Sequence, residues 1–264
     1  MVRILFLGDI VASLGRQIVH DLLPELKEEY SIDFTIANGE NATHGKGLSL
    51  AHYRELVEDG VDCVTMGNHY MRVQEILDKN AEYGKMIRPA NFNPSIPGRG
   101  SLIFEHSGIK IRVTNLIGRV GIDGADSNPF DCLDKILNDG EKVNIDFVDF
   151  HAEATGEKLA LANAFDGRIS CMVGTHTHVQ TNDARILPLG TGCICDAGMC
   201  GGYDTILGDD PEPIIRRTWH GLPAKFTCPK KGRAFLNGVV FSVNERTGKT
   251  EKIEPVQKFE DYSE

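Results

Sequence analysis

Two histidines follow a strand-like run in the second half of the chain. Residues 174–178 read Gly-Thr-His-Thr-His and come directly after the strand-like run 169–173. In an extended backbone, residues i and i+2 project to the same side, so we expect His176 and His178 to point the same way. Neutral imidazole is the commonest protein ligand of transition metals. The pair is therefore a candidate part of a metal site, and two solvent-facing histidines in a turn are the alternative.

Further polar side chains stand at the ends of other apolar runs. Strands are predicted over residues 2–7, 32–37, 61–66 and 144–150, with helical spacing between the first three. This order predicts parallel strands whose carboxyl ends share one edge of a sheet, where ligands usually bind. Any one of these polar residues could be an ordinary turn former. Eight follow such runs: Asp9, Glu40, Asn41, Asn68, His69, His151, His176 and His178.

This set combines carboxylate, amide and imidazole donors and contains no thiolate. Mixed oxygen and nitrogen donors suit Mn, Fe or Zn better than Mg or Ca. We therefore expect a pair of divalent or mixed-valence ions, with Fe or Mn favoured and Zn possible.

The remaining pattern predicts the elements around these residues. Helices are expected over residues 15–26, 49–59, 128–138 and 158–165, and a strand pair over 101–106 and 110–117. Further strands are expected over 184–187, 192–196 and 235–243, with a Gly-rich loop over 198–204 among them. No repeat or linker is present in the sequence, so residues 1–264 are predicted to form one domain.

Composition excludes several classes of function. Of the 264 residues, 41% are hydrophobic and 25% are charged, as in ordinary globular proteins. A net charge of −10 argues against binding to long nucleic acid. The charge does not exclude a small phosphorylated ligand, because bound cations would supply local positive charge.

The sequence also indicates a compartment. No apolar run approaches the length that spans a membrane, and the first nine residues are too short and too soon acidic for a signal peptide. Seven cysteines, an odd number, fit reduced thiols better than a disulfide framework. We predict a cytoplasmic protein without membrane contact.

Several of these segments resemble sequence blocks of a known superfamily, the calcineurin-like metallophosphoesterases. Its signature blocks are similar to Gly8-Asp9, Gly67-Asn68-His69 and His176-Thr177-His178. Those of its YmdB-like branch are similar to residues 38–41, 151–155, 174–181 and 196–199. The resemblance runs from the first strand to about residue 208. It implies an α/β fold, a four-layer sandwich of two mixed β-sheets flanked by helices, and 2′,3′-cyclic nucleotide phosphodiesterase activity in bacteria.

The resemblance also implies roles for the eight residues. One ion would be held by Asp9, Asn41 and His178, and the other by Asn68, His151 and His176. Glu40 would bridge the two ions, and His69 would protonate the leaving oxygen. Val11 and Glu40 stand where the wider superfamily has His and Asp, and the YmdB-like branch shares both departures.

Two cations about 3.5–4 Å apart can bind a bridging hydroxide that attacks phosphorus in line with the leaving oxygen. His69 as acid would add about 10²–10⁴-fold, and a metal-ligand or supporting role is its alternative. We expect a phosphodiesterase acting on small cyclic nucleotides. The alternatives are a phosphomonoesterase or nuclease on the same metals, or a regulatory protein that senses nucleotide and binds partners. Self-association is expected for a compact acidic enzyme.

Overall fold

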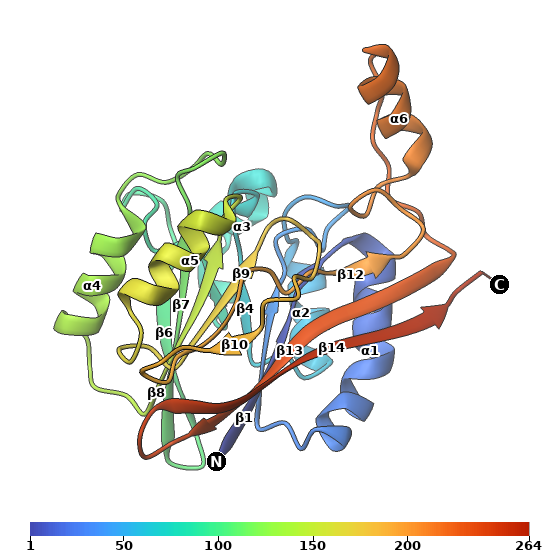
Figure 1. The fold of residues 1–264 in the computed structure, drawn as a ribbon. Helices are drawn as coiled ribbons and strands as arrows, with labels where there is room; N and C mark the ends of the chain where they lie inside the picture. The colour runs from blue at the N-terminus through green and yellow to red at the C-terminus, as the bar shows by residue number, and fades with distance from the viewer. Residues whose placement is uncertain (264) are drawn as a thin grey trace.

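A computed structural model describes residues 1–263 and contains two β-sheets packed face to face, with helices on their outer sides (Figure 1). Helices α1 (Ala12–Glu29) and α2 (Leu50–Glu58) pack on one sheet. Helices α4 (Pro129–Asp139) and α5 (Thr155–Ala164) pack on the other. The four-layer α/β sandwich implied by the resemblance is therefore confirmed.

The first sheet has eight strands in the order β2-β12-β13-β1-β3-β4-β5, with β14 paired to β13. Strands β1, β3 and β4 are parallel, as predicted, and β5, which was not predicted, continues the parallel set. Strand β13 runs antiparallel to β1. Their bounds are β1 Val2–Leu7, β2 Asp9–Ile10, β3 Phe34–Asn38, β4 Cys63–Thr65, β5 Met86–Ile87, β12 Met199–Gly202, β13 Arg233–Asn244 and β14 Lys249–Asp261.

The second sheet has six strands in the order β10-β11-β9-β8-β7-β6. Its central strands β7, β8, β9 and β11 are parallel, and the edge strands β6 and β10 are antiparallel to their neighbours. Their bounds are β6 Ser101–His106, β7 Ile109–Ile117, β8 Ile145–His151, β9 Cys171–Thr175, β10 Arg185–Ile186 and β11 Gly192–Ile194.

Strand β1 shows why both faces of the first sheet are apolar. Because successive side chains alternate in direction, Ile4 and Phe6 enter the core between the sheets, whereas Leu5 and Leu7 pack toward α1 and α2. Phe6 stacks on Phe147 of β8 with ring centroids 5.8 Å apart. Continuous apolar runs of this kind are typical of strands covered on both faces.

Local signals set the starts of two helices. The Ser49 side chain accepts a hydrogen bond from the His52 backbone N–H and caps α2, as predicted. Asn128 caps α4 in the same way, with Pro129 in the first turn. Helix α1 begins at Ala12, earlier than the expected residue 15. The short helices are α3 Gln74–Asp78, η1 Tyr70–Arg72 and η2 Asn80–Glu82.

The Gly-rich segment 198–204 was predicted as a loop, and this was wrong. It contains strand β12, which pairs with β2 and with β13. A Cβ atom on Gly8 would lie 2.0 Å from the carbonyl oxygen of Gly198. Glycine therefore allows two backbones to pack closely here. The glycine content of the segment alone fits both such a close-packed strand and a flexible loop.

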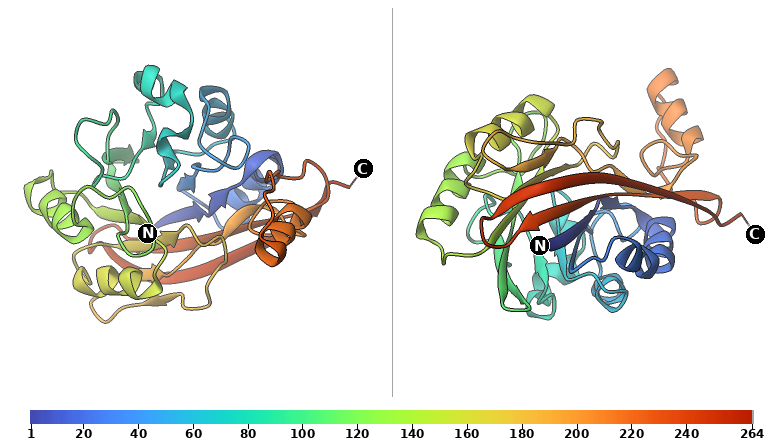
Figure 2. Two further views of the ribbon diagram at one scale, coloured as in Figure 1. Left: turned by 90° about the horizontal axis from the view of Figure 1, so that it is seen from above. Right: turned by 60° about the horizontal axis from the view of Figure 1, so that its bottom comes forward.

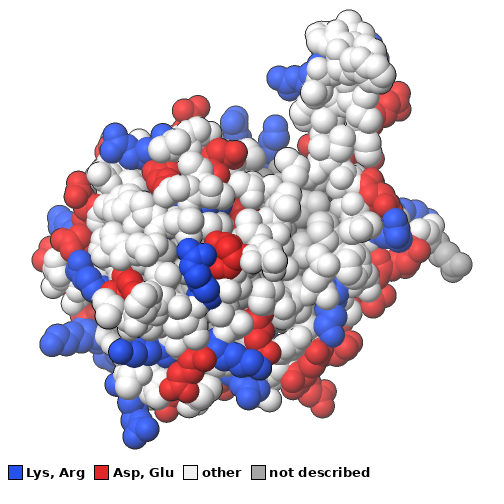
Figure 3. Space-filling model, viewed as in Figure 1, with Lys and Arg blue, Asp and Glu red and all other residues white. Residues whose placement is uncertain are grey.

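The C-terminal part of the chain contains β13, predicted over residues 235–243, and two elements that were not predicted, β14 and α6. Strands β13 and β14 form a long hairpin that crosses the molecule (Figure 2). The hairpin also reaches the second sheet, where the Thr250 hydroxyl donates to the carbonyl of Ser170 over 2.7 Å. Helix α6 (Pro211–His220) projects from the body, and within the described chain none of its residues is buried (Figures 1 and 3). Its Trp219 is 77% exposed.

Among residues 1–263, no helix has both the length and the apolar character needed to cross a bilayer.

Candidate metal centre

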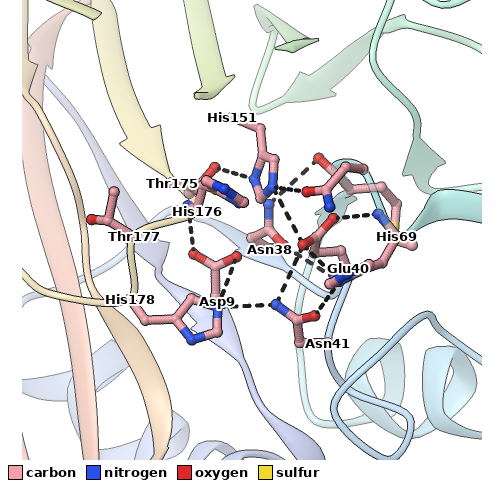
Figure 4. A network of polar contacts seen from close by, with 12 residues as sticks. Asp9, Asn38, Glu40, Asn41, His69, His151, Thr175, His176, Thr177 and His178 are labelled. Carbon is pink, nitrogen blue, oxygen red and sulfur yellow. Dashed lines mark hydrogen bonds and ion pairs between the residues drawn. The ribbon is translucent and has the colours of Figure 1, made fainter. Parts of the chain in front are cut away.

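All eight predicted residues come together where strand ends of the two sheets meet. Figure 4 labels all of them except Asn68, whose Oδ1 lies 3.0 Å from the His151 Nε2. The first sheet supplies Asp9 on β2 and the segments that follow β3 and β4. The second sheet supplies His151 at the end of β8 and the segment that follows β9. Convergence on shared strand ends was the main inference from the sequence, and the structure bears it out.

Asp9, Asn41 and His178 form a first group. The His178 Nε2 lies 3.1 Å from the Asn41 side-chain nitrogen and 3.9 Å from Asp9 Oδ1. Its Nδ1 lies 2.9 Å from the carbonyl oxygen of Leu207. Because Nδ1–H can donate to that carbonyl, Nε2 is left with its lone pair toward Asp9 and Asn41.

Asn68, His151 and His176 form a second group. The His151 Nε2 lies 3.0 Å from Asn68 Oδ1, and the rings of His151 and His176 are 4.9 Å apart. Glu153, which follows β8, places a carboxylate oxygen 3.3 Å from the His176 Nε2.

Glu40 lies between the two groups and is almost fully buried. Its Oε1 is 3.3 Å from the His151 Nε2 and 3.4 Å from the Asn41 side-chain nitrogen. A Cβ atom on Gly67 would lie 2.3 Å from the His151 ring and 2.4 Å from Glu40 Oε2. Only glycine fits at position 67, so the backbone after β4 can approach this carboxylate closely.

The donors fit cations. Among residues 1–263, Asp9 Oδ1 is buried without a hydrogen-bond partner. A buried carboxylate oxygen without a partner is costly, and a bound cation would satisfy it. Glu40, His151 and His176 each offer one ligand atom, and these atoms lie within 4.8 Å of one another.

Burial and the charges of neighbouring groups raise the pKa values of Asp9 and His151 and lower those of Glu40 and His176. Burial raises the pKa of Asp9, only partly offset by His178 and His151. Burial opposes ionisation of Glu40 too, but His151 and His69 hold its pKa well below the ordinary value. Burial would lower the pKa of His151, yet Glu40 raises it to about 9. Burial and the neighbouring His151 lower the pKa of His176 to about 3.

A buried chain of hydrogen bonds orients His151. Its Nδ1 lies 2.8 Å from the Thr175 hydroxyl oxygen, and that hydroxyl donates to Asp149 Oδ1 over 2.7 Å. Asp149 Oδ2 accepts from the Asn38 amide over 3.2 Å. Burial raises the pKa of Asp149 to about 6, against the opposing effect of His151. The sequence analysis missed Asp149 and Thr175; for Asp149 the available signal was a carboxylate within the apolar run 144–150.

The loop that carries the histidine pair is not extended. His176 has φ 103° and His178 has φ 65°, so the expectation that i, i+2 spacing in a strand orients the rings was wrong. Both rings reach the site because carboxylates fix the backbone. The His176 N–H donates to Asp9 Oδ2 and the Thr177 N–H to Asp196 Oδ2, each over 3.1 Å.

His69 lies at the mouth of the site, on a cavity of about 200 Å³ that Glu40, Asn41, Lys46, His176 and His178 also line. Its Nδ1 lies 2.7 Å from Asn41 Oδ1 and its backbone N–H donates to Glu40 Oε2. Within residues 1–263, no hydrogen bond involves its Nε2. With Nδ1–H donating to Asn41 Oδ1, the imidazolium form of His69 can donate from Nε2 to a ligand in the cavity.

Comparison with known proteins identifies the family. The family model described as "YmdB-like protein" matches residues 5–256. The chain is 47% identical to the 2′,3′-cyclic-nucleotide 2′-phosphodiesterase of Bacillus subtilis, over 98% of both chains.

Solved structures agree with this match. A crystal structure of a protein from Thermus thermophilus superposes with a TM-score of 0.92 at 39% identity, covering 98% of this chain and 100% of that one. A Mycoplasma pneumoniae protein described as a novel phosphatase superposes with a TM-score of 0.91 at 41% identity, covering 98% and 94%. The chain therefore belongs to the YmdB-like family of the calcineurin-like metallophosphoesterases.

Proposed function

We propose that this protein is a dinuclear metal-dependent phosphodiesterase that hydrolyses 2′,3′-cyclic nucleotides. The observation that carries the proposal is the arrangement of two donor groups around Glu40 on an open cavity, with Asp9 Oδ1 buried and unpartnered among residues 1–263. The B. subtilis relative, named for this activity, supports the substrate class.

Asp9, Asn41 and His178 would hold one ion, Asn68, His151 and His176 the other, and Glu40 would contact both. Bound divalent or mixed-valence ions would neutralise phosphate oxygens and lower the pKa of water toward neutrality. The donor set favours Fe or Mn, with Zn as a further candidate.

The chain's own groups complete the site. The imidazolium form of His69 is proposed to donate the Nε2 proton to the ribose oxygen that leaves phosphorus, while its Nδ1–H stays bonded to Asn41 Oδ1. Lys46 lines the same cavity and would attract the substrate's negative charge. Asp149 and Thr175 would keep His151 in one orientation, as partners of ligating histidines commonly do.

A phosphomonoesterase or nuclease on the same ions is the second candidate, supported by the M. pneumoniae structure described as a phosphatase. The test compares 2′,3′-cyclic AMP, p-nitrophenyl phosphate, its bis ester and short RNA, using protein whose metal content is measured. We expect hydrolysis of the cyclic nucleotide that Glu40→Gln abolishes and that the exposed Glu58→Gln control leaves intact. Hydrolysis of monoesters alone would overturn the proposal.

We also propose a cytoplasmic protein that acts on a small nucleotide, not on long nucleic acid or membranes, and that self-associates. The net charge of −10 and the unpaired state of all seven cysteines support the first two points. The projecting α6, with its exposed Trp219, supports self-association, because short helices are marginal without packing partners. Light scattering during size-exclusion chromatography tests this, and a strictly monomeric mass would contradict it.

A further inference from the structure

A second cavity, of about 500 Å³, lies beside the metal cavity. Its lining comes from the first turns of α1, from the loop after β3 and from the segment after α6. The side chains that matter for its chemistry are Arg16, His44, Lys225, Phe226, Cys228 and Lys230.

The two cavities are neighbours. Cys228 lines both, and His44 lines the second cavity while the adjacent Gly45 and Lys46 line the metal cavity. A Cβ atom on Gly45, which has φ +80°, would lie 2.8 Å from Cys228 Sγ, so these two segments touch at the boundary. A ligand held at the metal centre would therefore reach the second cavity by passing over the contact between Gly45 and Cys228.

The second cavity is basic although the chain as a whole is acidic. Across residues 1–263, neither Lys225 nor Lys230 takes part in an ion pair. The third cationic side chain, that of Arg16, is already paired, because its Nε lies 3.0 Å from a Glu55 carboxylate oxygen. Two further acidic residues contact the lining: Asp210 accepts from the Thr227 hydroxyl over 2.7 Å, and Asp209 accepts from the Cys228 thiol over 3.3 Å. Within the described chain, neither forms an ion pair with Lys225 or Lys230. Two ammonium groups are thus available to a ligand.

A 2′,3′-cyclic nucleoside monophosphate carries one charged group, which would lie at the metals, and its nucleoside is neutral. It offers nothing anionic to the second cavity. We propose that this cavity binds a phosphate on the 5′ side of the reacting nucleotide, through Lys225 and Lys230. The inference rests on the proposed function and names its substrate class: cyclic phosphates with a further 5′ phosphate. That phosphate is either the terminal 5′-phosphate of a mononucleotide or the internucleotide phosphate of a short oligonucleotide.

The first test measures binding and needs no turnover. Calorimetry with Mn²⁺-loaded protein compares adenosine 3′-phosphate with adenosine 3′,5′-bisphosphate. We expect the bisphosphate to bind at least about tenfold more tightly, and this ratio to fall toward one in Lys225→Ala/Lys230→Ala. Lys231→Ala is the matched control, because Lys231 is exposed and adjacent but does not line the cavity. It should keep the wild-type ratio.

The second test separates the two sources of phosphate. The kcat/KM for 2′,3′-cyclic AMP is compared with that for its 5′-phosphorylated form and for a diadenosine ending in a 2′,3′-cyclic phosphate. Preference for the 5′-phosphorylated mononucleotide alone assigns a terminal phosphate, and preference for the dinucleotide assigns the internucleotide phosphate.

Equal affinity of the wild type for the two adenosine phosphates would overturn the inference, whatever the enzyme's activity. An equal loss of preference in Lys231→Ala would overturn the assignment to this cavity. If the affinity ratio behaves as expected but no cyclic nucleotide is hydrolysed, the proposed function fails and the phosphate site stands. Thermal unfolding of each variant shows that the fold is retained.

Discussion

The ammonium group of Lys158 lies 2.8 Å from a carboxylate oxygen of Asp196, and both side chains are buried. Lys158 comes from α5 and Asp196 follows β11, so the ion pair joins a helix to the second sheet. The same carboxylate accepts the backbone N–H groups of Thr177 and Gly198. The pair therefore fixes the loop that carries His176 and His178.

Lys158→Met should destabilise the protein by about 3–5 kcal/mol, because it leaves the buried Asp196 charge without its partner. Metal affinity should fall with it, since the histidine loop loses its support. Urea unfolding and metal titration measure the two effects. The double variant Lys158→Met/Asp196→Asn should regain part of the stability, and a single variant as stable as the wild type would contradict this account.

Asp9→Asn should have opposite effects on folding and on metal binding. Burial raises the pKa of Asp9, so removing its charge should raise the melting temperature of the metal-free protein. The amide oxygen can still accept from the His176 N–H. Metal affinity should fall at least about 100-fold. Differential scanning fluorimetry with and without Mn²⁺ tests both; unchanged stabilisation by Mn²⁺ would exclude Asp9 as a ligand.

Thr175→Val removes the hydroxyl between His151 and Asp149 with little change in shape. The two partners lose a buried hydrogen bond, which should cost about 1–3 kcal/mol of stability. Because His151 is then free to reorient, metal affinity should fall about 10–100-fold. Thr175→Ser is the matched control, since it keeps the hydroxyl. Equal losses in both variants would place the effect in packing instead of hydrogen bonding.

His69→Ala should lower kcat for 2′,3′-cyclic AMP by about 10²–10⁴-fold while the metal content stays unchanged. The physical reason is the loss of a proton donor next to the leaving oxygen. A leaving group that needs no proton, such as p-nitrophenolate, should be much less affected. Loss of metal from His69→Ala would instead assign His69 to the ligands. His106→Ala, at a partly exposed histidine outside the site, is the control.

His52 predicts a pH dependence of stability. The Ser49 N–H donates to the Thr43 hydroxyl oxygen, and that hydroxyl lies 2.8 Å from the His52 Nδ1. Burial, with Arg16 nearby, lowers the pKa of His52 below 6.5 in the folded state. The unfolded chain therefore takes up the proton first, and stability is lost as the pH falls through 6.5.

Urea unfolding at pH 7.5 and at pH 5.5 checks this dependence. The loss between the two pH values should be smaller in His52→Gln than in the wild type, and unchanged in the control His220→Gln. The same acid dependence in His52→Gln as in the wild type would show that other groups cause it.

Much of the site followed from where apolar runs end. Asp9, Asn68 and His151 each follow or end a strand, and parallel strands bring such ends together. The contacts that orient these residues did not follow, because they depend on pairing between strands distant in sequence. The approach of Thr175 to Asp149, for example, requires the β8–β9 register.

The limits of the sequence patterns have physical causes. Spacing of i, i+2 predicted that His176 and His178 act together, but the backbone there is left-handed and held by Asp9 and Asp196. A Gly-rich segment such as 198–204 is compatible with a mobile loop or with close strand packing. The strand forms here because Gly8, distant in sequence, lets the two backbones approach closely. Helix α6 has no buried face within the described chain, so it was not predicted from apolar spacing toward a core, as the other helices were.

The pairing of β1 with β13 has a consequence for how the protein is made. Val2 pairs with Val243, so the strand that leads to Asp9 gains one neighbour only near the end of translation. Until those residues leave the ribosome, the N-terminal strand has an open edge and the metal-binding residues lack part of their framework. A nascent chain stalled before β13 should therefore be unable to retain metal and should depend on chaperones to avoid edge-to-edge aggregation.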